Sequence, residues 1–318
     1  APGATFADGS HTVDLDGESY AGPALITELR KRSRRWNLTL DFNQVSPTYR
    51  TQTGYDPWND QRNGFAWSQV NFYPDHGLVE RVSPGVFADG RWNYAGERKW
   101  LRANLFTDVF LRWAQTHVGV HYRFGEEVWS GVAFQDVWNA GANLDITPIG
   151  ALSVSAYADW GEGADLFTLA RGDEFDGGLA VQFKPLDRLI IEPVVDHVRS
   201  TDHVTGELLF RQTVARARLR YQFDRRLSLR LVVQHNDSRS GIYQDLAAAG
   251  QAPWYHLSFG SKWEVDPLLT YRLNSFSVFY AGSTHDWRDF NAADPDAATR
   301  YRQTARQFFV KLQYLWQL

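Results

Sequence analysis

Residues 305–318, Ala-Arg-Gln-Phe-Phe-Val-Lys-Leu-Gln-Tyr-Leu-Trp-Gln-Leu, alternate between apolar and polar side chains. One parity is apolar, at Phe308, Val310, Leu312, Tyr314, Trp316 and Leu318, and the other is mostly polar, at Gln307, Lys311, Gln313 and Gln317. Since successive side chains of a β-strand point to opposite faces, this pattern predicts a strand with one apolar and one polar face. Two interpretations are open for the stretch alone: the closing strand of a bacterial outer-membrane barrel, or an edge strand of a soluble sheet.

The composition decides between membrane helices and membrane strands. The chain has 318 residues and 15% aromatic side chains, yet the mean hydropathy is −0.42. Charged or amide side chains recur every few positions, so no apolar run approaches the roughly 18 residues that a spanning helix needs. A barrel strand crosses lipid in about 9 to 11 residues and alternates apolar with polar side chains. The composition therefore excludes a helical membrane protein and favours a β-barrel in outer-membrane lipid.

Other counts bear on the compartment and the partners. The sequence has no Cys, which excludes disulfides and thiolate metal sites. It has no Met either, even at position 1, which suggests removal of a signal peptide and hence export. The formal net charge is −4, whereas nucleic-acid binders are usually basic, so we expect no nucleic-acid partner.

Alternating segments follow one another along the whole chain from about residue 21. Short connections at 147–150, 184–187, 224–226 and 274–275 alternate with longer polar loops at 161–173, 235–253 and 283–304. Short periplasmic turns and long external loops are typical of outer-membrane barrels, whereas a soluble sandwich turns more often. Pro193 interrupts one apolar parity, and we expect a local bulge there. The prediction is an all-β chain with an N-terminal loop or first strand at 1–20. Residues 21–318 are then a transmembrane antiparallel up-and-down β-barrel of about 16 strands, within 14 to 18.

The strand count leaves one question open. Fifteen strands are counted from about Ala21, and bacterial barrels normally have an even number. Either residues near Thr12 to Asp16 supply a sixteenth strand, or the chain is a fragment and an N-terminal fragment or another subunit completes or plugs the barrel.

Several motifs resemble one bacterial family. They are Leu-Asp-Phe-Asn-Gln-Val-Ser-Pro-Thr-Tyr-Arg at 40–50 with Thr-Gly-Tyr-Asp-Pro at 53–57, Thr-Tyr-Arg-Leu-Asn at 270–274, Val-Phe-Tyr-Ala-Gly at 278–282, and the ending at 306–314. They are similar to the C-terminal outer-membrane barrel domain of a family of unknown function, over most of the chain from about Asp16. Longer members carry a carbohydrate-binding module of family-nine type before the barrel, which this sequence lacks. The resemblance implies an outer-membrane barrel and supplies no catalytic residues.

The chemistry of the predicted lumen centres on arginines. Arg216, Arg218 and Arg220 take the inward parity because Ala215, Ala217, Leu219 and Tyr221 take the lipid parity, and Arg230 faces the same way. Glu192 and Asp196 on the preceding strand are inward as well and are candidate partners. One interpretation is a charged constriction that selects solutes. The other is a structural ion-pair network that fills a polar lumen, which is the ordinary content of such barrels.

Weaker candidates are polar and aromatic residues near the strand ends. The acidic sets Asp286, Asp289, Asp294 and Asp296, and Asp173, Glu174 and Asp176, are assigned to external loops, where solvated carboxylates are more common than a hard-cation site. His117 and His121 lack a third ligand, so no metal site is predicted. A membrane-interface girdle is predicted for Trp36, Trp113, Trp160, Tyr314 and Trp316. The remaining loop tryptophans, Trp58, Trp254 and Trp287, are candidates for stacking on glycans.

The sequence thus predicts a porin-like outer-membrane β-barrel of a Gram-negative bacterium, with a periplasmic C-terminus. Its polar, arginine-lined lumen indicates a channel, transporter or secretion conduit. Two alternatives stay open: a structural or accessory barrel that anchors partner proteins without conducting, and a surface barrel that binds glycans. No nucleophile elbow or phosphate loop is present, so neither an enzyme nor a cofactor is expected.

Overall fold

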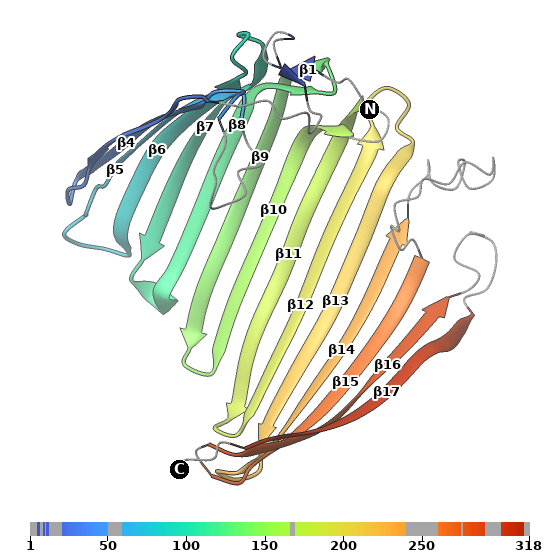
Figure 1. Ribbon diagram of the computed structural model, residues 1–318. Coiled ribbons are helices and arrows are strands. Elements are labelled where there is room, and N and C mark those ends of the chain that lie inside the picture. The colour runs from blue at the N-terminus through green and yellow to red at the C-terminus, as the bar shows by residue number, and fades with distance from the viewer. Residues whose placement is uncertain are drawn as a thin grey trace. The chain divides into compact units, whose positions relative to one another are not determined.

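The computed structural model describes residues 5–6, 9, 11–12, 21–49, 59–165, 169–239, 260–274, 276–289 and 300–314. Within them, β1 (Thr5–Phe6) and β2 (His11–Thr12) pair with each other, and fifteen further strands form one sheet in strict sequence order (Figure 1). These strands are β3 (Ala24–Lys31), β4 (Trp36–Val45), β5 (Gln61–Val70), β6 (Val79–Trp92), β7 (Arg98–Leu111), β8 (Thr116–Trp129), β9 (Val132–Ile149), β10 (Leu152–Asp165), β11 (Ala170–Leu186), β12 (Leu189–Asp202), β13 (Leu208–Gln222), β14 (Leu227–Arg239), β15 (Gly260–Arg272), β16 (Val278–Asp289) and β17 (Tyr301–Gln313).

The predicted fold class, an all-β up-and-down barrel fold of 14 to 18 strands, is confirmed. The order of hydrogen-bonded strands runs from β3 to β17 without a crossover, as a meander requires. Among the described residues, β17 pairs with β16 only and β3 with β4 only. Thr12 pairs with Thr5 and not with the large sheet, while residues 13–20 lie outside the described part, so the proposed sixteenth strand stays a prediction.

The chain divides into two compact units. The first comprises Ala1–Val109, Gly119–Ala140 and Leu166–Leu169, and the second comprises Phe110–Val118, Gly141–Asp165 and Ala170–Leu318. In the first unit, β3 to β6 form a regular antiparallel meander. Its tight turn at 32–35 is held by Ser33, whose hydroxyl donates to the carbonyl of Trp36 (2.6 Å) and accepts the Trp36 N–H (3.0 Å).

The second unit contains β10 to β17, and its two faces differ in chemistry. Directly opposite residues of antiparallel strands share a face, so the registers assign every side chain to one side. We call the side that carries Leu229, Leu231 and Val233 of β14 the apolar face, and the side that carries Arg216, Arg218 and Arg220 of β13 the polar face. Other members of the apolar face include Ile191, Val195, Leu219, Leu269, Ala281, Val310 and Leu312.

The second unit has a short-turn end and a long-loop end. The connections 150–151, 187–188, 223–226 and 273–277 lie at the short-turn end, and 166–169, 203–207, 240–259 and 290–300 lie at the long-loop end. The predicted turns at 224–226 and 274–275 match, whereas those predicted at 147–150 and 184–187 lie mostly within strands, because β9 runs to Ile149 and β11 to Leu186. The predicted loops at 161–173, 235–253 and 283–304 are wrong in extent. Strands β10, β11, β14, β16 and β17 run several residues into them because backbone pairing continues there.

The expectation of a bulge at Pro193 is also wrong. Pro193 lies opposite Ala217 in an unbroken register between β12 and β13. Between β11 and β12 the register partners are Ala180–Val194 and then Phe183–Ile191, and the shift occurs only beyond Phe183, beside the turn. Proline lacks an N–H but its fixed φ suits an extended strand, so the local ladder is weakened without displacing the strand.

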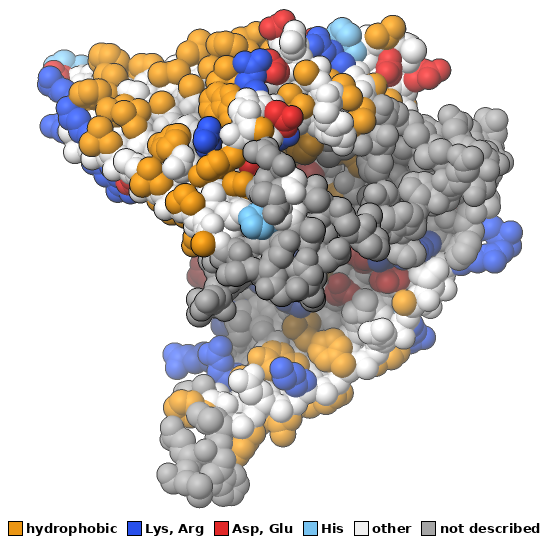
Figure 2. All heavy atoms as spheres, turned by 45° about the horizontal axis from the view of Figure 1, so that its top comes forward, with side chains coloured by type: hydrophobic (Ala, Val, Ile, Leu, Met, Phe, Trp, Pro, Cys, Tyr) orange, Lys and Arg blue, Asp and Glu red, His pale blue; other side chains and the backbone are white. Residues whose placement is uncertain are grey.

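Little of the described chain is buried. Among the described residues, the buried hydrophobic side chains are Val45, Phe134, Val137 and Leu209, whereas large exposed ones occur on most strands. Figure 2 shows hydrophobic side chains gathered in broad patches on the surface. Among the described residues, no helix has the length and apolarity needed to cross a membrane. The hydrophobic side chains of this sheet are therefore mostly exposed and not packed in an internal core, and an exposed apolar surface of this kind marks a site of contact with another apolar phase.

Candidate functional site: a basic cluster on the polar face

Four arginines share the polar face near the short-turn end. Arg216, Arg218 and Arg220 occupy every second position of β13, which spaces their backbones about 6.6 Å apart. Arg230 of β14 lies directly opposite Arg220. We call these four residues the arginine cluster. The sequence predicts correctly that all four share one face, because the alternation of β13 and β14 is regular. That this face is the inward one stays a prediction.

One carboxylate serves two members of the arginine cluster. Glu192 of β12 lies directly opposite Arg218. Its Oε1 is 3.3 Å from Nη2 of Arg220, and its Oε2 is 3.8 Å from Nη1 of Arg218. Gln182 of β11 donates to the same Oε1 at 3.2 Å. Four guanidinium groups and one carboxylate give this set a formal charge of +3 (four minus one).

The arginine side chains of the cluster remain accessible. The side chains of Arg218 and Arg220 are 42% and 47% exposed, against 20% for Glu192. Arg220 and Arg230 are like charges in directly opposite positions, an arrangement that destabilises a sheet unless an anion lies between them. The cluster is therefore a solvent-accessible positive surface with one partly buried counter-charge.

Asp196 belongs to a different polar group on the same face. It lies opposite Val214 of β13 and Gly178 of β11. The hydroxyl of Tyr157 on β10 donates to Asp176 (3.1 Å) and approaches Asp196 (3.5 Å). The Tyr157 ring passes over Gly178, where a Cβ would lie 2.4 Å from ring atom Cε1. Sequence reasoning missed this group because it depends on Gly178, a glycine on the strand between Tyr157 and Asp196.

A further charged group lies on the polar face toward the long-loop end. Lys262 of β15 donates to Glu264 and is 3.5 Å from Asp286 of β16. Arg288 lies directly opposite Lys262, and these residues border a cavity of about 240 Å³. In this group the charges are nearly balanced, unlike in the arginine cluster.

The assignment of the acidic sets to loops is wrong for every member that the structure describes. Asp173, Glu174 and Asp176 lie within β11, and Asp286 and Asp289 lie within β16. Asp173 therefore points to the opposite face from Glu174 and Asp176, and Asp286 to the opposite face from Asp289, so the described members of each set do not form one oxygen cage. Asp294 and Asp296 lie outside the described residues.

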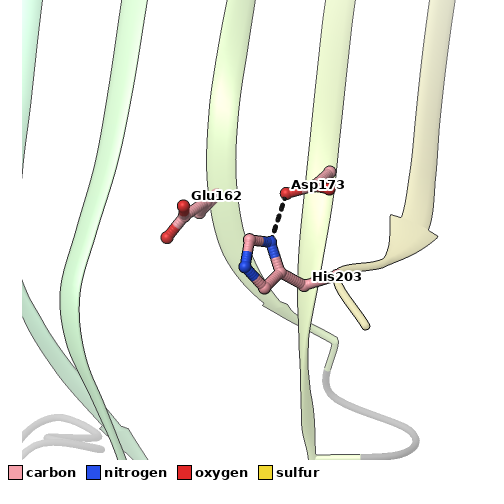
Figure 3. Close-up of side chains that lie close together, drawn as sticks. All are labelled: Glu162, Asp173 and His203. Carbon is pink, nitrogen blue, oxygen red and sulfur yellow. Dashed lines mark hydrogen bonds and ion pairs between the residues drawn. The ribbon is translucent and has the colours of Figure 1, made fainter. Parts of the chain in front are cut away.

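Asp173 instead joins a group of charged side chains at the long-loop end (Figure 3). Glu162 of β10 lies directly opposite it, and Nδ1 of His203, just after β12, is 2.8 Å from Asp173 Oδ1. One ligand atom from each of the three residues lies within 4.8 Å of the others. Arg171 Nη1 is also 3.1 Å from Glu162 Oε2, which gives this carboxylate a cationic partner. The hydrogen bond to the Asp173 carboxylate, and then its charge, raise the pKa of His203. The group is best described as an ion-pair network.

The two histidines of β8 each contact a polar partner. His117 Nδ1 is 3.3 Å from Asp145 Oδ2, and His121 Nε2 is 2.9 Å from Asn139 Oδ1. Each contact is one that an ordinary polar histidine of a sheet makes.

Aromatic residues predicted for the girdle lie at strand ends or near them. Trp36 begins β4, Trp113 lies in the 3₁₀ turn Trp113–Gln115 after β7, and Tyr314 follows β17. Trp160 lies on the apolar face of β10, opposite Phe175. Trp316 lies outside the described residues.

Trp160 belongs to a row of aromatic rings along the apolar face. We call this row the ring row. Phe175 and His197 lie 6.1 Å apart between ring centres, and His235 and Trp263 lie 4.5 Å apart. Trp287 lies opposite Trp263 within β16, so its assignment to a loop is wrong; Trp58 and Trp254 lie outside the described residues. The ring row consists of Trp160, Phe175, His197, His235, Trp263 and Trp287.

The strand order and the two faces define the class of protein as an all-β chain with the up-and-down β-barrel fold. Comparison with protein-family models and with curated protein sequences gives no match. The family resemblance of the sequence therefore stays a prediction.

Solved structures with a similar arrangement include three outer-membrane proteins. An anion-selective porin from Comamonas acidovorans has 9% identity and a TM-score of 0.36, covering 92% of this chain and 96% of that chain. Outer-membrane expressed OmpT of Vibrio cholerae has 8% identity and a TM-score of 0.34, covering 91% and 100%. The in-vitro folded OmpT of the same organism has 10% identity and a TM-score of 0.34, covering 94% and 99%. Likenesses this distant transfer no function to the chain.

Proposed function

We propose that the chain is an outer-membrane β-barrel whose polar face lines a water-filled lumen, and that it passes solutes with a preference for anions. The placement in a membrane is supported by the apolar face of β10 to β17. Its hydrophobic side chains are exposed, and few hydrophobic side chains of the described residues are buried. Alternation of lipid-facing and lumen-facing side chains is the pattern of such barrels. By the same pattern, the long-loop end is external, and the short-turn end, which Gln313 of β17 reaches, is periplasmic.

The arginine cluster is the single observation that carries the anion preference. Its four guanidinium groups face one carboxylate, so the local field is positive and attracts anions into the lumen. A purely structural network would be expected to match its cations with carboxylates, as Lys262, Glu264, Asp286 and Arg288 do closer to the loops. The excess of positive charge in the arginine cluster therefore favours a role in solute selection over a role in filling the lumen.

Membership of the resembled bacterial family is part of the proposal. The motifs at 40–57 and 270–282 support it, and it adds a membrane location without adding an activity. A structure of a longer family member would test it: the register of β14 to β17 should recur there, and a different register would contradict membership.

The proposed function is tested by swelling of liposomes that contain the purified protein. Neutral, anionic and cationic solutes of equal size are compared, and the anionic solute should enter fastest. Arg216→Ala with Arg218→Ala should remove most of this difference while leaving the neutral solute unaffected or faster. A matched control is Arg211→Ala with Arg239→Ala, which removes two arginines from the other face. Equal rates for the three solutes would contradict anion selection, and no swelling at all would support a non-conducting accessory barrel.

A further inference from the structure

A polar groove lies on the apolar face at the long-loop side of the ring row, two members of which, His197 and His235, take part in its lining. It spans β12 to β17 and has a volume of about 460 Å³. Its lining includes Arg211, His235, Asp237, Arg239, Ser261 and Tyr301. The proposed function does not use this groove, because all of these side chains point away from the polar face.

Two arginines of the groove share one carboxylate. Arg211 of β13 and Arg239 of β14 lie directly opposite each other. Asp237 Oδ2 is 3.1 Å from Arg211 Nη2 and 3.8 Å from Arg239 Nε. Like charges in opposite positions repel, and of the two carboxylates that line the groove, Asp237 and Asp289, the ion pairs to Arg211 and Arg239 come from Asp237. A second anion of phosphate type would satisfy the remaining guanidinium donors, since guanidinium groups bind phosphate in a bidentate manner.

The other side of the groove carries hydroxyl and imidazole groups. His235 Nε2 is 2.8 Å from Ser261 Oγ and 3.2 Å from Tyr301 Oη, and the two hydroxyl groups are 2.5 Å apart. Oδ1 of Asp289, also in the lining, accepts the backbone N–H of Arg300 at 2.7 Å. Groups that both donate and accept hydrogen bonds, placed beside carboxylates, suit a ligand with many hydroxyls, such as a sugar.

The same strands become apolar directly below the groove. Val195, Ala215 and Val233 continue the apolar face toward the short-turn end, on strands β12 to β14. Rings of the ring row, including His235 and Trp263, lie at the boundary between the two regions. A ligand that fills the groove therefore has room for an apolar tail along the sheet, which a soluble sugar phosphate does not need.

We propose that this groove binds the headgroup of a phosphorylated glycolipid from the outer leaflet. Arg211 and Arg239 contact a phosphate, the groups around Tyr301 and Ser261 contact sugar hydroxyls, and the acyl chains lie along Val195, Ala215 and Val233. The proposal rests on the membrane location given under Proposed function, but not on the conduction of solutes.

The test is native mass spectrometry of the full chain in detergent, titrated with a doubly phosphorylated, acylated glucosamine disaccharide (lipid A). The unmodified protein should retain one molecule in preference to further ones. Arg211→Ala with Arg239→Ala should weaken retention about tenfold or more, because one charge-assisted hydrogen bond is alone worth roughly that factor. Arg216→Ala with Arg218→Ala removes two charges from the same strand on the opposite face and should bind as the unmodified protein does.

Three further arms make the result decisive. Tyr301→Phe removes one hydroxyl without altering charge and should weaken binding, by less than the arginine double variant does. This single variant keeps the site testable if the double variant does not fold. Dephosphorylated probe should bind as weakly to the unmodified protein as intact probe does to the arginine variant. Inorganic phosphate or a soluble glucosamine phosphate that binds as tightly as the lipid would overturn the lipid assignment. Equal retention by the groove variant and by the opposite-face control would overturn the site.

The same preparations separate this inference from the proposed function. If the protein conducts but retains no lipid, the glycolipid site in the groove is refuted and the channel is not. Lipid retention without conductance refutes the channel alone.

Discussion

Glu192 is the residue on which the balance of the arginine cluster depends. Its two oxygens lie 3.3 Å from Arg220 and 3.8 Å from Arg218. Glu192→Gln would remove the only carboxylate in contact with the cluster among the described residues. We expect the anion preference in liposome swelling to rise, because the local charge becomes more positive by one. Gln182→Ala, which removes a neutral donor to the same oxygen, is the control and should leave the preference unchanged. A lower anion preference in Glu192→Gln would contradict this account.

His203 makes the stability of the long-loop end depend on pH. Its pKa is raised, mainly by the hydrogen bond to Asp173. The stabilisation from this pair is fully present below the unfolded pKa of about 6.5 and is lost as pH rises through the higher folded value. We expect Asp173→Asn to lower the pKa of His203 toward 6.5, as measured by NMR titration of its ring. An unchanged value would show that Asp173 is not the partner in solution.

Strand β14 illustrates how far alternation determines an element. Leu231 belongs to the apolar face and Val232 to the polar face, although they are neighbours. In lipid, Leu231→Arg should destabilise the protein by about 2–4 kcal/mol, the range for arginine near the middle of the bilayer. Val232→Arg should cost clearly less because it enters the lumen. Urea unfolding in lipid vesicles measures both, and equal losses would argue against the assignment of the two faces.

Individual elements also show where sequence reasoning succeeds and where it stops. The parity of Arg216 and Arg230 follows from alternation, which is a property of a strand alone. The strand positions of Asp173 and Trp287 could not be predicted, because polar strand ends beyond a membrane resemble loops in composition. The groups around Glu162 and Arg211 could not be predicted either, because their members come together across strands whose register the sequence does not reveal.

At the scale of the whole molecule, the strand edges impose a physical requirement. Among the described residues, β17 pairs on one side only, with β16. An unpaired backbone edge in hydrocarbon would leave donors and acceptors unsatisfied, at several kcal/mol for each group. The outer edge of β17 therefore needs a partner strand, from this chain or from another.

Hydrogen exchange in lipid nanodiscs tests that requirement. The amides of residues 308–313 that point away from β16 should exchange as slowly as those that point toward it. Fast exchange of the outward half of β17 would contradict a closed wall in the membrane.

The central claim is that the polar face lines an anion-preferring lumen, and a reversal potential tests it most directly. The purified protein is placed in a planar bilayer that separates two KCl solutions of unequal concentration. We expect discrete conductance steps and a reversal potential displaced toward the equilibrium potential of chloride. Displacement toward that of potassium, or a bilayer that never conducts, would contradict the claim.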